Sequence, residues 1–229
     1  MAKADVTSEI VGYQQITIPT GYSLFTVTFK DVGGDEYDIQ DIKVLTTAGA
    51  DYASNNKVKM QKLSVAGEYL TLYNYRLSKG GWCQGSTYVG TAAVTFADGE
   101  GVALYNGDAS ELKLQVSGAV NLTPVSTAIP TASYKIIGNP TPVSVDLQDV
   151  IPYLGENICS ANNKVKVQKI GTDGEYGTLY NWRQSKGGWC QGSTFVGENV
   201  VTLAPGEGLA VYNGESEAVT LKFPSPISE

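Results

Sequence analysis

The chain has 229 residues, of which 42% are hydrophobic and 10% aromatic, enough apolar material for one large core or two cores of about 110 residues each. Its net charge of -7 and pI near 4.7 argue against nucleic-acid or acidic-membrane partners, which need clustered Lys and Arg. The absence of histidine removes the commonest general base and transition-metal ligand, so neither a Ser or Cys triad nor a zinc site is expected.

The opening segment, MAKADVTSEI, lacks the apolar core of a signal peptide, and no stretch approaches the roughly 18 apolar residues of a membrane span. We therefore expect no membrane insertion, and either an intracellular protein or the mature form of an exported one. We also expect the terminal segments to pair with a sheet, either of this chain or of a neighbouring copy by strand addition.

The acidic stretch KDVGGDEYDIQD is a candidate calcium site. Clustered carboxylates on a glycine-containing loop supply the oxygen ligands that Ca²⁺ prefers, and the candidates are Asp31, Asp35 and Asp38. The spacing does not match an EF-hand, and a solvated charged loop is the alternative. No other metal and no cofactor is predicted.

The segments that follow have a strand-and-turn pattern. Short runs rich in Val, Leu, Tyr and Thr are separated by the turn sequences AGE, KGG, DGEG and NGD, which is typical of a sandwich or barrel. The expected strands are 57–63, 69–75, 93–96, 102–105 and 112–116. A short helical turn is predicted at 38–44 and again at 146–151, because an acidic residue precedes spaced apolar residues in both.

An internal repeat dominates the sequence. The segment 55–107 matches 162–214 without a gap at about two-thirds of its positions, which indicates a recent duplication. The similarity extends outwards, since IPTGYSLFTVTF parallels IPTASYKIIGNPTPV and YDIQDIKV parallels VDLQDVIP. We therefore predict an all-β chain of two tandem homologous sandwich or barrel-like domains with short helical turns. Their predicted ranges are 1–117 and 118–229, with a junction near 117–121.

The eight letters GGWCQGST occur in both copies, at 80–87 and 187–194. We interpret this motif as a hairpin whose tryptophan anchors each domain. Its glycines are expected to supply positive φ in tight turns, because no strand-to-helix GxGxxG or GxxxxGK context indicates phosphate binding.

The order of motifs also resembles a known family. Each copy has a Tyr-rich opening strand (IVGYQQITIPTGYSLFTVTF in the first), a DIQDI or DLQDV turn, a KVKVQK-like strand, an EYGTLYNWRQSKGGW-like segment and an APGEGLAVYNG-like hairpin. This order resembles the tandem β-domain proteins found among secreted and surface proteins of planctomycete, verrucomicrobial and related bacteria. The resemblance implies a duplicated, exported all-β domain and brings no catalytic residues. The first copy departs from the pattern, with TVTFKDVGGDEYD in place of IIGNPTPVSVD and DGEG in place of PGEG.

An aromatic and polar cluster in each copy is a candidate binding site. Sugar rings stack on aromatic faces, and their hydroxyls bond to Arg and Gln. The candidates are Tyr73, Arg76, Trp82 and Gln84 in the first copy, and Tyr180, Arg183, Trp189 and Gln191 in the second. The alternative is that the large aromatic rings fill the core or seal the interface between the domains.

The chain has three cysteines, and two of them occupy equivalent positions. If the domains face each other about a pseudo-two-fold axis, Cys83 and Cys190 could form a disulfide in an oxidising compartment. The alternative is that they are buried free thiols, and Cys159 has no counterpart in either case. A catalytic thiolate is not expected, because no histidine is present to activate it.

Catalysis by carboxylates is not expected either. The acidic pairs present in both copies are Glu68 with Glu100 and Glu175 with Glu207, and each lies beside a turn glycine. This placement is typical of turn residues rather than of a catalytic pair in a cleft.

We therefore expect a non-enzymatic extracellular or cell-surface protein that self-assembles into a filament, tube or layer through β-strand contacts. Head-to-tail contacts between near-identical units generate open polymers when the rotation does not close. Two alternatives stay open: a carbohydrate-binding module with one aromatic site per repeat, and a structural protein of a phage virion. The expected partners are other copies of the chain and, in the carbohydrate-binding alternative, glycans.

Overall fold

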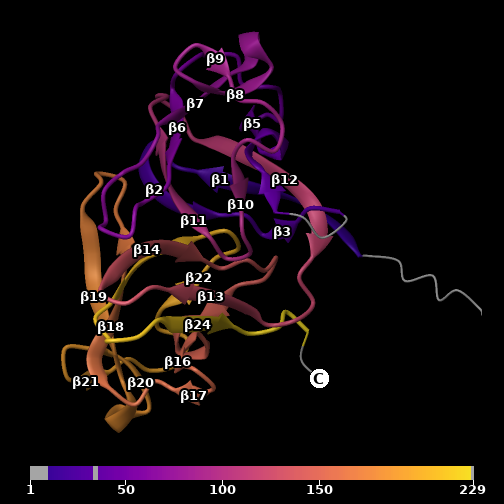
Figure 1. Cartoon of the computed structure of the whole chain (residues 1–229). Helices are drawn as coiled ribbons and strands as arrows, with labels where there is room; N and C mark the ends of the chain where they lie inside the picture. The colour runs from indigo at the N-terminus through magenta and orange to yellow at the C-terminus, as the bar shows by residue number, and fades with distance from the viewer. Residues whose placement is uncertain (1–9, 33–35, 228–229) are drawn as a thin grey trace, which may run out of the picture.

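The computed structural model describes residues 10–32 and 36–227. The described residues form an all-β structure of small antiparallel sheets arranged like a propeller, with four 3-10 turns of three residues each (Figure 1). The predicted all-β class is confirmed. Among these residues, no helix has the length and apolar character needed to cross a membrane.

The first half of the chain, residues 10–120, forms one set of sheets. Its strands are β1 (Val11–Ile18), β2 (Gly21–Thr26), β3 (Phe29–Lys30), β4 (Tyr37–Asp38), β5 (Lys43–Thr46), β6 (Val58–Gln61), β7 (Tyr73–Arg76), β8 (Gly81–Gln84), β9 (Thr87–Tyr88), β10 (Thr95–Phe96), β11 (Gly101–Asn106) and β12 (Leu112–Val120). One sheet has the order β1-β12-β3, with β5 also paired to β12. A six-stranded sheet has the order β2-β11-β6-β7-β8-β9, and β4 pairs with β10.

The second half, residues 121–227, repeats this arrangement. Its strands are β13 (Val125–Ile129), β14 (Ser133–Gly138), β15 (Val145–Asp146), β16 (Ile151–Leu154), β17 (Asn157–Ile158), β18 (Asn162–Ile170), β19 (Tyr176–Arg183), β20 (Gly188–Gln191), β21 (Thr194–Phe195), β22 (Thr202–Leu203), β23 (Gly208–Asn213) and β24 (Val219–Phe223). The sheets have the orders β13-β24-β16-β17, β14-β23-β18-β19-β20-β21 and β15-β22. The six-stranded sheets therefore match strand by strand, as the sequence repeat requires.

The expected helical turns and the segment between the halves can be compared with the observed elements. The two expected helical turns are present as the 3-10 turns Ile39–Asp41 and Leu147–Asp149, each capped by the aspartate before it. The expected junction at 117–121 falls largely inside β12, which continues to Val120 because it pairs with β1 and β3. The connection to β13 is the segment 121–124. The terminal segments that were expected to pair with a sheet, 1–9 and 228–229, lie outside the described residues.

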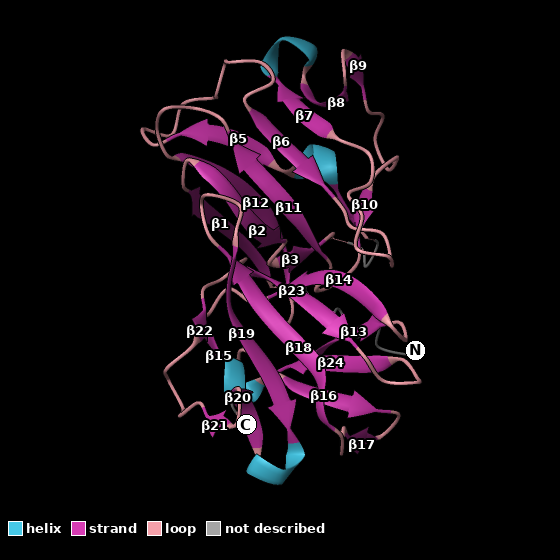
Figure 2. Cartoon of the chain, turned by 90° about the vertical axis from the view of Figure 1, so that its left-hand side faces the viewer, coloured by secondary structure: helices cyan, strands magenta, loops and turns pink. Residues whose placement is uncertain are grey.

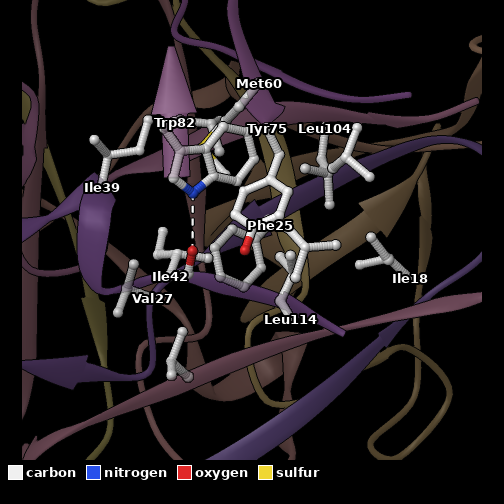
Figure 3. Packing of buried hydrophobic residues seen from close by; sticks show 14 of the residues in the cluster. Ile18, Phe25, Val27, Ile39, Ile42, Met60, Tyr75, Trp82, Leu104 and Leu114 are labelled. Atoms are coloured by element: carbon white, nitrogen blue, oxygen red, sulfur yellow. Dashed lines mark hydrogen bonds between the residues drawn. The ribbon is translucent and has the colours of Figure 1, made fainter. Parts of the chain in front are cut away.

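Two hydrophobic clusters fill the halves, and they share no residue. One is built from residues between Ile18 and Val116 and the other from residues between Val125 and Phe223. In each, side chains from the sheet that contains the long strand β12 or β24 pack against side chains from the six-stranded sheet. Figure 3 shows the first cluster around Trp82.

The repeated motif GGWCQGST forms the hairpin β8–β9 and its equivalent β20–β21. The Trp82 indole is completely buried, and its Nε1 donates to the backbone oxygen of Ile42 at 2.8 Å (Figure 3). The Gln40 side chain accepts from the Trp82 backbone N–H at 3.0 Å and donates to the Trp82 and Val89 oxygens. A Cβ at Gly81 would lie 2.4 Å from the Gln40 Oε1, so only glycine fits there. The predicted role of the motif as a hairpin with a core anchor is confirmed.

The outer faces of the two six-stranded sheets meet between the halves. A third cluster joins Leu24, Ala103 and Ile136 there. The same contacts occur twice with the halves exchanged, since Thr26 N donates to the Gly206 oxygen at 2.9 Å and Gly138 N donates to the Gly99 oxygen at 3.2 Å. The two halves are therefore related by an approximate two-fold axis. Figure 2 shows β6 and β11 of one half and β18 and β23 of the other on the same side of the molecule.

Candidate functional site

The predicted sugar-stacking tryptophans have no accessible face. Trp82 and Trp189 are both 0% exposed, and each belongs to the core cluster of its half. Tyr73 and Tyr180 are half-buried and pack against the same clusters. The prediction that these rings form a binding surface is wrong for the tryptophans, because the pleat of β8 and β20 turns them inwards.

The polar members of the predicted cluster lie along the hairpins. Gln84 and Gln191 are exposed at the ends of β8 and β20. The Arg183 Nε donates to the Gly192 oxygen at 2.8 Å, whereas the Arg76 Nε is buried without a hydrogen-bond partner among the described residues. None of the eight predicted residues lines either of the grooves described below.

The predicted disulfide does not form. Cys83 and Cys190 are buried free thiols, as is Cys159. Their strands β8 and β20 lie at opposite ends of the molecule in both views (Figures 1 and 2), because the two-fold contact involves the other edge of each six-stranded sheet. The sequence repeat shows that Cys83 and Cys190 occupy equivalent positions, but it does not give the distance between them.

The candidate calcium ligands are not gathered into a site in the part of the chain that the structure describes. Asp38 is buried and caps the turn that follows, where its Oδ1 accepts from the Gln40 backbone N–H at 3.0 Å. Its Oδ2 accepts from the Ala92 backbone N–H. Asp35 lies outside the described residues, and Asp31 is half-buried. No group of three or more potential metal ligands is found among residues 10–32 and 36–227.

Two of the four hairpin glutamates, Glu100 and Glu207, make side-chain contacts within the described part of the chain. The Glu100 carboxylate accepts from the Ala97 backbone N–H at 3.2 Å and pairs with Lys62 at 3.0 Å. The equivalent Glu207 accepts from Ala204 N at 2.9 Å and pairs with Lys169 at 2.7 Å. Both carboxylates are therefore occupied by the protein itself.

Two surface grooves lie at equivalent positions on the six-stranded sheets. The first has a volume of about 410 Å³ and the second about 690 Å³. The lining of the first is Tyr22, Lys59, Met60, Gln61, Tyr69, Leu72, Ala103, Leu104 and Tyr105. The equivalent positions in the second groove are Tyr134, Lys166, Val167, Gln168, Tyr176, Leu179, Ala210, Val211 and Tyr212, and all of them line it. Each groove is therefore lined by three tyrosines, a lysine and a glutamine at equivalent positions.

The tyrosines of each groove form a tilted pair, with interplanar angles of 48° and 42°, and an exposed third ring. Tyr22 and Tyr105 have ring centroids 4.8 Å apart, and Tyr134 and Tyr212 have the same separation. The third rings, Tyr69 and Tyr176, are 50% and 52% exposed. Burial raises the pKa of Tyr69, and the charges of Tyr176 and Tyr22 raise it further.

A hairpin from each half contacts a groove tyrosine of the other half. The turn at 64–68 places Ala66 and Gly67 in the wall of the second groove, and the Tyr134 backbone N–H donates to the Val65 oxygen at 3.1 Å. The turn at 171–175 contacts Tyr22 of the first groove, whose backbone N–H donates to the Thr172 oxygen at 2.9 Å, but it adds no residue to the lining of that groove. At both turns a glycine is required, because a Cβ on Gly67 would lie 3.0 Å from the ring of Tyr134.

The alternation of residues in KVKMQK indicates these grooves, but the prediction of an aromatic binding cluster did not use it. In KVKMQK, the residues Val58 and Met60 point into the core, so Lys59 and Gln61 between them face outwards. The second copy, KVKVQK, keeps both outward residues. Identical polar residues on the outer face of a strand serve no core, which makes them stronger binding candidates than a tryptophan in a glycine-rich hairpin.

No protein-family model, no curated protein and no solved structure matches this chain. The resemblance of its motifs to the tandem β-domain surface proteins therefore stays a prediction.

Proposed function

We propose that the chain is a non-enzymatic carbohydrate-binding protein of the cell exterior, built from two homologous β-sandwich domains with one tyrosine-lined groove each. The observation that carries this proposal is the pair of equivalent grooves. The three tyrosines, the lysine and the glutamine that line the first groove are all present at the equivalent positions of the second.

The chemistry of the grooves suits a polyhydroxylated ligand. The faces of Tyr69 and Tyr176 offer flat apolar surface on which the C–H groups of a pyranose ring pack. Gln61 and Gln168 carry both donors and acceptors, which matches the mixed hydrogen bonding of sugar hydroxyls. Their side-chain nitrogens donate to the Leu70 and Gly177 oxygens at 2.9 Å, which fixes their orientation.

The proposal is tested by titrating the protein with a panel of oligosaccharides in a calorimeter. We expect Tyr69→Ala and Tyr176→Ala each to weaken binding about fivefold to tenfold, since each removes one stacking surface. Tyr88→Ala is the matched control, because Tyr88 is similarly exposed on β9 and lies outside both grooves. Binding that survives the double variant Tyr69→Ala, Tyr176→Ala unchanged would contradict the proposal. Tryptophan fluorescence is a poor reporter here because the indoles are buried.

We also propose, as a second function, self-assembly through the edge strand β1, in a bacterial surface layer or a phage virion. Among the described residues, β1 pairs only with β12, so its other edge is unpaired. Val11 and Tyr13 project from it and are exposed. An unpaired, apolar edge strand is a template for pairing with another chain.

Negative-stain electron microscopy with light scattering at rising protein concentration tests this second proposal. We expect the natural chain to form regular polymers. We expect the Val11→Lys variant not to form them, because a charge on the edge opposes strand addition. The control is Val200→Lys, which adds the same charge at an exposed site away from β1. Thr17→Lys would not serve, because Thr17 lies on β1 itself. Discrete monomers at all concentrations would overturn self-assembly and leave the carbohydrate proposal intact.

A further inference from the structure

The grooves differ in charge from the rest of the protein. The chain has 23 acidic residues against 16 Lys and Arg, yet neither groove is lined by a carboxylate. The first groove contains Lys59, and the second contains Lys166 and Lys135. Positive lining on an acidic protein attracts a ligand of negative charge and leaves the remaining surface repulsive to it.

The groove lysines are free to bind such a ligand. Lys59 and Lys166 form no ion pair with a carboxylate in the described part of the chain. Their ammonium groups lie 5.7 Å and 6.0 Å from the ring centroids of Tyr105 and Tyr212, which keeps each cation beside the stacking surface. An acidic group on a sugar that stacks in the groove would therefore meet a positioned cation.

Lys135 adds a second cation to the second groove. Its Nζ donates to the Ala128 oxygen at 3.1 Å and has further N–H groups available. Burial lowers the pKa of Lys135; the charge of Glu100 opposes this effect and that of Lys62 adds to it. Glu100 and Lys62 pair with each other at 3.0 Å. The equivalent position in the first groove is Ser23, because Ser23 pairs with Leu104 as Lys135 pairs with the equivalent Val211.

The two grooves form one surface. The turn at 64–68 of the first half contacts Tyr134 of the second groove, and the turn at 171–175 of the second half contacts Tyr22 of the first groove. The strands that carry the grooves lie on the same side of the molecule (Figure 2). A chain-like ligand can therefore occupy both grooves at once.

We propose that the grooves bind an acidic polysaccharide, whose sugar rings stack on the tyrosines and whose carboxylates or sulfates pair with Lys59, Lys135 and Lys166. This inference rests on the proposed carbohydrate-binding function and narrows it to one ligand class. The second groove, with two lysines, is the stronger of the two. A single strand that crosses both grooves gains avidity because the second contact is intramolecular.

The test is calorimetric titration of the full chain with a polyuronate, a sulfated glucan, a neutral glucan and polyglutamate, all of matched length. We expect both acidic chains to bind at least tenfold more tightly than the neutral one, and binding to weaken as salt is raised. Preference for the polyuronate over the sulfated glucan identifies the carboxylate as the group bound, and the reverse preference identifies the sulfate.

Variants assign the effect to the grooves. We expect Lys166→Gln and Lys135→Ser each to weaken acidic-chain binding about tenfold, since each removes a charge-assisted contact. Ser23→Lys, which copies the second groove into the first, should strengthen it. Lys186→Gln removes a lysine outside both grooves and should change nothing.

Four results would overturn the inference. Equal binding of neutral and acidic glucans would leave the carbohydrate function standing and remove the charge preference. Equal binding of polyglutamate and polyuronate would show that the grooves recognise negative charge rather than a sugar. Binding of the acidic chains that is indifferent to Lys166→Gln and Lys135→Ser would place the contact elsewhere, and binding of no glycan at all would overturn the proposed function as well.

Discussion

The two halves of this chain share a similar arrangement of strands but differ in some of the residues that fill their cores. Tyr37, buried in the first half, is replaced by Val145, and Tyr52, which hydrogen-bonds to Asp108, is replaced by Cys159 beside Glu215. The three tyrosines, the lysine and the glutamine that line the first groove all have identical counterparts in the second. The grooves differ elsewhere, since Lys135 of the second half stands where the first half has Ser23. The cores thus differ in the size of some buried side chains, whereas these five groove positions are the same in both halves.

The tryptophan hairpins provide the strongest test of whether the two scaffolds are equivalent. Trp82→Ala and Trp189→Ala should each lower the free energy of unfolding by about 3–5 kcal/mol, because each empties the centre of a cluster and leaves a backbone oxygen without its donor. Urea denaturation measures both, and Gln84→Ala on the same hairpin should cost almost nothing. A cost below 1 kcal/mol for either tryptophan, on the order expected of a surface residue, would contradict the anchor role.

The fold was largely readable in the sequence because its determinants are local. The repeat, the turn glycines and the aspartate caps at Asp38 and Asp146 follow from neighbouring residues. The ends of β12 were not readable, because β1 and β3 pair with it from distant parts of the chain. The contribution of Ala66 and Gly67 to the wall of the second groove depends on how the two halves meet, which no local pattern encodes.

Alkaline pH should affect the stability of the two halves differently. Burial raises the pKa of Tyr37 to about 12, and the charges of Asp41 and Asp31 add to the effect. Between pH 10 and 12 the unfolded chain loses this proton while the folded chain keeps it, so stability that is complete below pH 10 falls by about 2 kcal/mol as pH rises. The valine at the equivalent position 145 makes no such contribution.

Tyr37→Phe sharpens this comparison. The variant should be less stable than the natural chain at neutral pH, because it loses the hydrogen bond to the Ser117 oxygen, and should lose less stability between neutral and alkaline pH. Denaturant midpoints of both proteins across that pH range measure the difference, with the exposed Tyr88→Phe as control. Parallel pH profiles for the Tyr37→Phe variant and the natural chain would refute the assignment.

The smallest expected difference in stability is between the two equivalent ion pairs, Lys62–Glu100 and Lys169–Glu207. Lys62→Met and Lys169→Met should each cost no more than about 1 kcal/mol, because both pairs are partly exposed. The cost should be slightly larger for Lys62, whose pair is better shielded from solvent. Thermal unfolding at low and high salt measures this, and equal sensitivity to salt in both variants and the natural chain would show that the pairs contribute through packing alone.

The reciprocal hairpins have a consequence for how such a protein could arise. A single copy of the repeat could complete the second groove only by pairing with another copy about a two-fold axis, because Ala66 and Gly67 come from the other half. Joining the copies in one chain makes that completion independent of protein concentration. It also ends the symmetry that a homodimer imposes on both grooves, and Lys135 opposite Ser23 is a difference that only the fused chain can carry.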